Sequence, residues 1–273
     1  MPELPEAETI GRALAKALAG RTIRDVEVFT PAMRTSLYPL KTASLPGRVF
    51  TSVRRRGRYL VAALDDGRGL VMHFGMSGVV RVEPASVPRR KHEHVFIHLD
   101  DGNVFRFECT RRFSLLELHS LDDSGMPQML ASLGMEPLSG DFTGEKLFAA
   151  FQKRKTPVKV ALMDNAIVCG IGNIYATETL FACRIDPRRC ADTITLEECR
   201  DIVRHSRRIL QHAIECGGTT ISDFKSVDGS EGKFVLHLQI YGKYGSPCPE
   251  CRSIISSCQL GGRTSAFCPE CQK

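Results

Sequence analysis

The first half of the chain alternates short apolar runs with turn residues, and this pattern predicts strands. Partly alternating runs rich in Val, Ile, Leu and Phe lie at 22–29, 58–64, 78–82, 94–99 and 103–107. Asp-Asp-Gly at 65–67, and again at 100–102, separates neighbouring runs as a hairpin turn would. Many short strands joined by tight turns predict an all-β sandwich or barrel. Before them, apolar residues at helical spacing over 3–19, followed by Gly20, predict one helix.

After Pro127 the apolar residues recur at helical spacing. Helices are expected over 128–133, 144–152, 157–163, 174–181 and 196–213, and the last of these opens with a Thr195-x-x-Glu198 capping box. A Gly-Gly break follows at 217–218, then a Ser-, Asp- and Gly-rich stretch at 219–233 that predicts an exposed loop, and a strand is expected at 234–241. The pattern as a whole predicts a multidomain α+β chain. Its parts are an N-terminal β-sandwich with flanking helices (1–127), a helical module (128–225) and a C-terminal hairpin (226–273).

Composition places the chain among ordinary globular proteins. It has 273 residues, of which 42% are hydrophobic and 25% are charged, and this disfavours disorder, collagen and coiled coil. No apolar run approaches the 18 or more residues that span a bilayer, so no membrane partner is expected. The acidic start lacks the basic region of a secretory signal. We therefore expect a cytoplasmic protein.

Four of the eleven cysteines have metal-ligand spacing. Two C-x-x-C pairs are separated by sixteen residues and consist of Cys248, Cys251, Cys268 and Cys271. Such pairs are typical of a tetrahedral, closed zinc site, in which the metal is structural. The sequence therefore predicts one structural Zn²⁺ holding the C-terminal hairpin. The other seven cysteines follow no motif and are expected to be mostly buried free thiols.

The net charge of +6 is a mild basic excess, and its distribution is more informative than its size. Basic residues gather at 54–58, 111–112 and 153–159, on different predicted modules. One such run alone would be an ordinary solvated face, whereas three of them together with Arg263 favour a phosphate-binding surface. Gly170 and Gly172 lead into a helix at Asn173, which also suits a phosphate, although glycines that simply allow close packing would give the same pattern.

Pro2 could supply a reactive amine if Met1 is removed. A secondary α-amine is partly unprotonated near neutral pH, and its attack on an aldehyde-level carbon gives an iminium ion that promotes elimination. Glu3 and Glu6 follow at the positive end of the first predicted helix, where they could act as a proton donor and a supporting carboxylate. Proline and acids are also common at helix starts, and composition alone favours that simpler interpretation.

Beyond these features, the chain resembles the formamidopyrimidine-DNA glycosylase (Fpg, MutM) family along its whole length. The likeness rests on Met1–Glu8, His73–Gly78, Lys91–Val95, Arg111–Phe113, Leu162–Asn165, Gly170–Glu178, Gly217–Thr220, Tyr241 and the terminal cysteines, in the family's order. The resemblance implies a β-sandwich, a helix–two-turn–helix module and a zinc finger. It also implies a bifunctional DNA glycosylase and AP lyase of base excision repair. Such an enzyme excises oxidised purines (8-oxoguanine and formamidopyrimidines) by β,δ-elimination and acts as a monomer on double-stranded DNA.

The same resemblance implies roles for particular residues. Pro2 would be the nucleophile and Glu3 the proton donor, and the catalytic set as a whole would be Pro2, Glu3, Glu6, Arg58 and Arg263. DNA would be bound by His73, Met76, His92, Arg111, Phe113, Lys159, Asn173 and Tyr241. Within this set Met76, Arg111 and Phe113 would fill the hole left by an extruded base, and the loop 219–233 would close over that base.

Three departures from the family pattern bear on lesion preference and DNA affinity. Arg58 stands where the family usually has Lys, Cys109-Thr110 where it commonly has Asp-Pro, and Ser257-Cys258 where a lysine is frequent. Three other functions stay open. One is an endonuclease VIII-like enzyme for oxidised pyrimidines, which Leu4 and the set of Met76, Arg111 and Phe113 disfavour. The others are a non-catalytic damaged-DNA-binding paralogue and a zinc-ribbon adaptor.

Overall fold

A computed structural model describes residues 2–219 and 232–273. The chain divides into two compact units: the first unit combines Met1–Ala131 with Gly217–Lys233, and the second combines Ser132–Cys216 with Phe234–Lys273. Most of the predicted loop 219–233 lies outside the described residues. The three-part division proposed from the sequence stays a prediction. In the described part of the chain, no helix combines the length and apolar character needed to cross a membrane.

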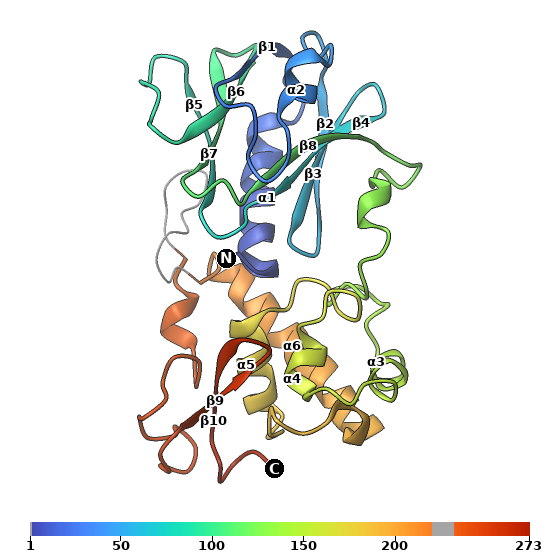
Figure 1. Cartoon of the computed structure of the whole chain (residues 1–273), viewed down its shortest axis with the longest axis vertical. Coiled ribbons are helices and arrows are strands. Elements are labelled where there is room, and N and C mark those ends of the chain that lie inside the picture. The colour runs from blue at the N-terminus through green and yellow to red at the C-terminus, as the bar shows by residue number, and fades with distance from the viewer. Residues whose placement is uncertain (1, 220–231) are drawn as a thin grey trace. The chain divides into compact units, whose positions relative to one another are not determined.

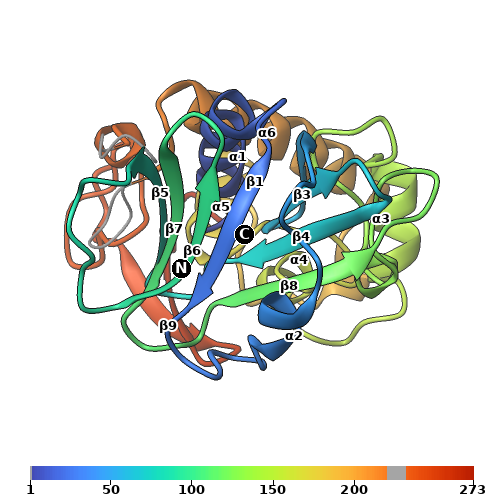
Figure 2. The same cartoon turned by 90° about the horizontal axis from the view of Figure 1, so that it is seen from above.

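The first unit contains two four-stranded antiparallel sheets (Figures 1 and 2). One has the order β1 (Ile23–Val28), β6 (Glu93–Leu99), β7 (Asn103–Cys109), β5 (Gly78–Pro84). The other has the order β2 (Phe50–Arg56), β3 (Tyr59–Leu64), β4 (Arg68–His73), β8 (Leu115–Ser120). Phe105 and Phe107 of the first sheet share one buried core with Phe50 and Leu70 of the second. The predicted sandwich is therefore confirmed, whereas β2, β4 and β8 lie outside the runs that the sequence pattern identified.

Helix α1 (Leu4–Leu18) completes this core by burying Ile10, Leu14 and Leu18. Its apolar residues recur every three to four positions, so they form one stripe that faces the sandwich. A short helix, α2 (Tyr38–Thr42), buries Leu40 in the same core. Because the stripe fixes the rotation of α1, it also fixes where the first turn of that helix, directly after Pro2, is held.

The second unit is helical, as predicted. It contains α3 (Gly144–Phe151), α4 (Val158–Leu162), η2 (Ala191–Thr193), α5 (Asn173–Ala182) and α6 (Leu196–Glu215). Thr195 and Glu198 form the expected capping box at the start of α6. The helix expected at 128–133 is only a 3-10 turn, η1 (Gln128–Leu130), which belongs to the first unit.

The C-terminal segment forms the expected hairpin, with β9 (Ser256–Leu260) paired antiparallel to β10 (Arg263–Phe267). The strand expected at 234–241 is wrong, because the segment opens with a 3-10 helix, η3 (Phe234–His237). Phe234, Leu238 and Ile240 are buried but Leu236 is 80% exposed, so the apolar residues do not share one face as in a strand. The backbone N–H groups after η3 donate to a side chain instead of to a neighbouring strand, as described below.

Candidate functional site

The start of α1 is held by a buried carboxylate. Glu6, only 3% exposed, accepts a hydrogen bond from the Glu3 backbone N–H to Oε2 (2.9 Å) and one from the Thr219 backbone N–H to Oε1 (2.8 Å). Glu3 is itself 4% exposed and is the N-cap of the helix. One side chain therefore joins the first turn of α1 to a segment more than two hundred residues later in the chain.

Gly218 explains why a Gly-Gly pair precedes Thr219. Its φ is +84°, a conformation that L side chains rarely adopt, and a Cβ there would lie 3.1 Å from Glu6 Oε1. The backbone can thus approach the Glu6 carboxylate closely. The structure keeps Pro2, Glu3 and Glu6 together, as their neighbouring positions in the sequence suggested. It adds Thr219 as a hydrogen-bond partner of Glu6, which no local sequence pattern indicated.

His73, at the end of β4, is a neutral imidazole with a defined tautomer. Its Nδ1 accepts a hydrogen bond from the Gly75 backbone N–H (3.2 Å), so the ring proton lies on Nε2. Burial lowers the pKa of His73 to about 4, and the positive charges of Arg58 and Arg34 act in the same direction. The ring also packs against Tyr59, with centroids 4.8 Å apart. The Nε2–H is therefore suited to donate to an anion at neutral pH. Arg58, 9% exposed, supplies a buried positive charge in the same surroundings.

Met76 and Phe113 are large apolar side chains that the structure leaves exposed, at 51% and 58%. Their loops lie side by side: a Cβ on Gly75 would be 2.8 Å from the Phe113 carbonyl oxygen, and the Ser114 hydroxyl donates to the Phe74 carbonyl (2.7 Å). The exposed Arg111 guanidinium is 6.0 Å from the Phe113 ring centroid. Three residues that the sequence nominated as a wedge are thus brought to one edge of the sandwich.

Cys109 lies at the base of this wedge and is completely buried. Its Sγ lies 3.0 Å from the Ser114 hydroxyl oxygen, and its backbone N–H donates to the carbonyl of His92 (2.9 Å). His94 Nε2 is 3.0 Å from the Cys109 carbonyl oxygen. The loop base is therefore held by hydrogen bonds where the family commonly has Asp-Pro. His92, half-buried, is located next to it by this backbone bond.

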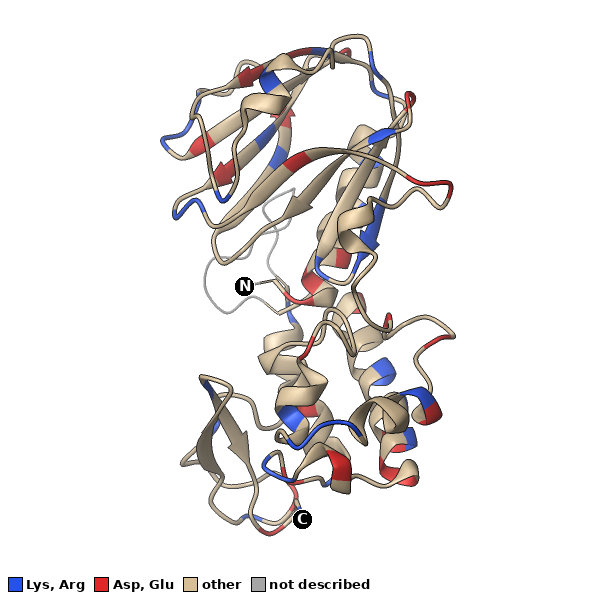
Figure 3. Cartoon of the chain, turned by 45° about the vertical axis from the view of Figure 1, so that its right-hand side comes forward, with Lys and Arg blue, Asp and Glu red and all other residues tan. Residues whose placement is uncertain are grey.

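The basic runs are less available than the sequence suggests. Arg55 donates to Glu8 of α1 (2.7 Å) and its side chain is only 9% exposed. Arg54 donates to the Ser124 carbonyl oxygen (2.8 Å). Acidic residues are interleaved with Lys and Arg in both units (Figure 3). Part of the 54–58 run therefore has a structural role, and phosphate binding by the basic runs stays a prediction.

In the second unit, Lys159 is 0% exposed and positions its neighbours. Its Nζ donates to Asn173 Oδ1 (2.7 Å) and to the Ser265 hydroxyl (2.7 Å), while Asn173 Nδ2 donates to the Thr264 carbonyl (3.2 Å). These bonds tie the N-terminal end of α5 to β10. Asn173 is thus brought to the hairpin whose second strand begins at the exposed Arg263. Direct contact of Lys159 with a phosphate stays a prediction.

Sequence reasoning gave no role to Glu178, a carboxylate on α5 that is 4% exposed. It accepts hydrogen bonds from the backbone N–H groups of Gln239 (2.9 Å), Ile240 (3.0 Å) and Tyr241 (2.8 Å). This anchor replaces the expected strand pairing and fixes the backbone that carries Tyr241. An acid within an apolar helical stretch was the signal that could have identified it.

The four predicted zinc ligands converge at the base of the hairpin. The sulfur atoms of Cys248, Cys251, Cys268 and Cys271 all lie within 4.8 Å of one another. The Ser253 hydroxyl lowers the pKa of Cys251 to about 6, whereas burial raises the pKa of Cys268 and Cys271. Cys248 and Cys268 also belong to a small core with Phe181, Ile240 and Ile255. A tetrahedral thiolate site fits this donor set, and its position explains how so small a core is stabilised.

Comparison with known proteins identifies the family. The models described as the formamidopyrimidine-DNA glycosylase N-terminal domain, its H2TH domain and the zinc finger found in FPG and IleRS match residues 1–116, 133–225 and 245–273. The chain belongs to the formamidopyrimidine-DNA glycosylase family. The family resemblance, the mixed α/β fold with its helix–two-turn–helix module, and the enzyme class expected from the sequence are thereby confirmed. The glycosylase zinc finger and the four clustered cysteines likewise support one structural zinc.

Individual glycosylases match the whole chain. The formamidopyrimidine-DNA glycosylase of Laribacter hongkongensis is 42% identical, with all of both chains covered. Among solved structures, a Lactococcus lactis Fpg variant in complex with DNA containing Fapy-dG has a TM-score of 0.91 at 33% identity and full coverage of both chains. The L. lactis Fpg with abasic-site DNA has a TM-score of 0.90 at 32% identity, covering 99% of each chain.

Proposed function

We propose that this glycosylase excises oxidised purines from double-stranded DNA and then cleaves the strand as an AP lyase, with Pro2 as the nucleophile. The observation that carries the proposal is the buried Glu3–Glu6 pair, which fixes the first turn of α1 immediately after Pro2 and joins it to Thr219. Solved relatives in complex with Fapy-dG and abasic DNA support both the substrate and the lyase step. We propose that it acts as a monomer in the cytoplasm.

The chemistry begins once Met1 has been removed. The Pro2 nitrogen attacks C1′ of the damaged nucleotide while Glu3 protonates the ring oxygen O4′ and the C1′–O4′ bond breaks. The base then leaves C1′ with the proton that the Pro2 nitrogen gives up, and the nitrogen lone pair forms the iminium. The resulting iminium ion cannot lose its charge as a neutral imine, so it acidifies the C2′ proton. β-Elimination then expels the 3′ phosphate, δ-elimination expels the 5′ phosphate, and hydrolysis of the iminium regenerates Pro2.

The remaining predicted residues have two tasks in this proposal. Met76, Arg111 and Phe113 fill the space that the extruded base vacates, for which an exposed thioether, a guanidinium and an aromatic ring are suited. Phosphates are bound by cations and N–H donors. These donors are His73 through Nε2–H, with Arg58, His92, Asn173, Tyr241 and Arg263, while the buried Lys159 contributes its charge and holds Asn173 in place.

Borohydride trapping tests the proposal. Purified protein whose intact mass shows that Met1 is absent is incubated with a duplex carrying 8-oxoguanine opposite cytosine, and reduction should fix a covalent protein–DNA adduct. Glu3→Gln should abolish base release, whereas Glu145→Gln, the same change at an exposed position of α3, should leave it unchanged. Binding without any adduct from correctly processed protein would refute the proposal and favour a non-catalytic paralogue. Faster processing of an oxidised pyrimidine would favour the endonuclease VIII-like alternative.

A further inference from the structure

Two imidazoles and one thiol meet in the second unit, and they share no residue with the sites described above. His212 and Cys216 lie one turn apart at the C-terminal end of α6, and His237 is the last residue of η3. Their candidate ligand atoms all lie within 4.8 Å of one another, and Cys216 Sγ is 3.8 Å from His212 Nε2. These residue types are the ligands that borderline-soft divalent metals prefer.

The distances are those of a metal site. With bonds of about 2.0–2.3 Å to nitrogen and sulfur, two ligands of a tetrahedral ion lie about 3.5 Å apart. The His–Cys separation is therefore within a few tenths of an ångström of the requirement. Positions four apart on a helix share one face, so α6 presents two ligands together and η3 adds the third.

A carboxylate lies near His212, within ion-pair range but beyond hydrogen-bond distance. Glu215 Oε2 lies 3.9 Å from His212 Nδ1, the ring nitrogen that would remain free if Nε2 bound the metal. A carboxylate on the outer nitrogen orients a histidine ligand and increases its basicity. His212 and His237 also line a cavity of about 790 Å³, together with Glu215 and Glu250. A fourth, exchangeable ligand could reach the ion from this cavity.

We propose that His212, Cys216 and His237 form a second transition-metal site, distinct from the four-cysteine zinc site. It takes Zn²⁺ or a metal of similar ligand preference through three protein ligands and keeps one position for water or an exogenous ligand. Ring packing alone accounts for the contact between the two histidines, whose centroids are 4.8 Å apart, but it gives no role to the thiol. The bound ion would cross-link the end of α6 to η3.

Cobalt titration of the full-length, zinc-loaded protein tests the site. We expect one equivalent of Co²⁺ to bind in addition to the resident zinc and to produce a thiolate-to-cobalt charge-transfer band with visible d–d bands. Cys216→Ser should remove that charge-transfer band, and Glu215→Gln should weaken Co²⁺ binding about 10-fold. His237→Ala, at an exposed position, should also abolish tight binding of the second equivalent.

Matched controls separate this site from others. Cys190→Ser changes an exposed thiol outside the cluster and His205→Ala changes a histidine on the same helix, so both should titrate like the unmodified protein. A charge-transfer band that persists in Cys216→Ser would come from exchange into the four-cysteine site and would overturn the proposal. One metal per chain after equilibrium dialysis against excess Zn²⁺ would overturn it equally.

Discussion

Replacing Glu6 by Gln should slow the chemistry while leaving the sandwich folded. The Glu6 carboxylate accepts the backbone N–H groups of Glu3 and Thr219 with its two oxygens, in a site that is 3% exposed. Glutamine retains one oxygen and presents its NH₂ group to the second N–H. The variant therefore loses one hydrogen bond to a charged group and leaves two donors facing each other.

The magnitude follows from that exchange. A hydrogen bond to a charged group contributes about 1.5–3 kcal/mol. If this free energy is lost from the positioning of the first turn of α1 next to Pro2, the rate of the chemical step should be about 10- to 100-fold lower, because each 1.36 kcal/mol corresponds to a factor of ten in rate. Single-turnover borohydride trapping on 8-oxoguanine duplex measures this rate, and denaturant unfolding measures the stability separately.

A second variant perturbs the contact between Glu6 and the 218–219 backbone through the backbone instead of through the carboxylate. Gly218→Ala leaves Glu6 intact but places a Cβ 3.1 Å from its Oε1, at a φ of +84°. This should cost about 1–3 kcal/mol and reproduce the kinetic defect. Glu27→Gln, which removes an exposed ion pair with His98 on the sandwich, is the control and should leave the rate unchanged. Unaltered rate and stability in both Glu6→Gln and Gly218→Ala would refute the role assigned to this carboxylate.

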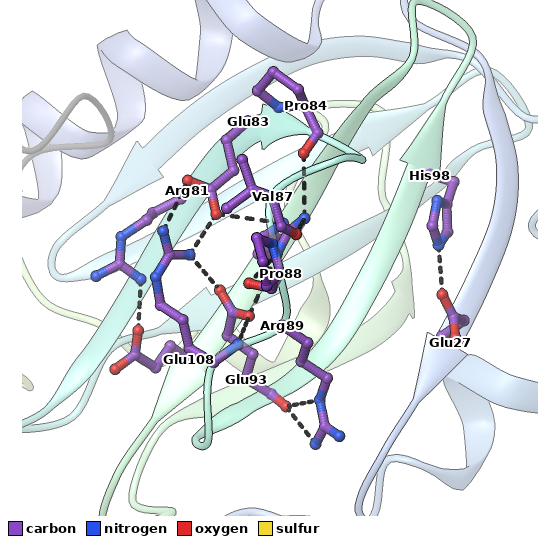
Figure 4. Close-up of polar contacts among 12 residues, drawn as sticks. Glu27, Arg81, Glu83, Pro84, Val87, Pro88, Arg89, Glu93, His98 and Glu108 are labelled. Carbon is purple, nitrogen blue, oxygen red and sulfur yellow. Dashed lines mark hydrogen bonds and ion pairs between the residues drawn. The ribbon is translucent and has the colours of Figure 1, made fainter.

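Three further outcomes are expected. The free energy of unfolding should fall between pH 6.5 and pH 4, because the pKa of His73 is about 4 in the folded chain and the unfolded chain therefore takes up the proton first. The loss is at most about 3 kcal/mol. A His73→Gln variant should lack this contribution when the free energy of unfolding is compared at pH 7 and pH 4.5. Chelation of zinc should open the β9–β10 hairpin and weaken DNA binding while the sandwich stays folded, so hydrogen exchange that left the hairpin protected would contradict a structural metal. Arg106→Met should cost about 3–5 kcal/mol, because Arg106 Nη1, on a side chain that is 1% exposed, lies 3.5 Å from Oε2 of the fully buried Glu93. Figure 4 labels Glu93 among its polar contacts. Thermal unfolding measures the change, and an unchanged midpoint would show that the pair is not needed.

The sequence predicted elements best where one face of a strand or helix is apolar. β6, β7 and α1 were found because their apolar residues recur with the period of the element. β2 was missed because three consecutive arginines interrupt its alternation, and its place in the sheet depends on contacts such as Arg55 with Glu8 that no local pattern contains. The expected strand at 234–241 failed for the converse reason: its apolar residues suit a strand, but Glu178 takes the backbone donors.

The residues of the candidate site likewise fall into those that a local sequence pattern can indicate and those that only the folded chain brings together. Pro2, Glu3 and Glu6 could be proposed because their chemistry is local and adjacent in sequence. Their partner Thr219 and the Lys159 partner Ser265 lie 213 and 106 residues away from the residues they bind, so only the folded chain reveals them. Sequence reasoning thus proposes candidate reactive groups, whereas the residues that contact them across the fold are found from the structure.

The Arg58 departure has a consequence for how protons move in the proposed reaction. Lysine can both bind a phosphate and release a proton, but a guanidinium stays charged at every pH at which the protein is folded. Arg58, buried and close enough to His73 to lower its pKa, can therefore contribute charge to the site but cannot shuttle a proton. His73 is neutral with its Nδ1 already accepting the Gly75 N–H, so it too is a donor of a hydrogen bond and not a base. Among the predicted catalytic residues of the first unit, proton transfer in the proposed reaction then falls to Glu3. The Glu6 contacts that hold Glu3 in place should therefore affect the reaction rate more than the replacement of the family's lysine by Arg58.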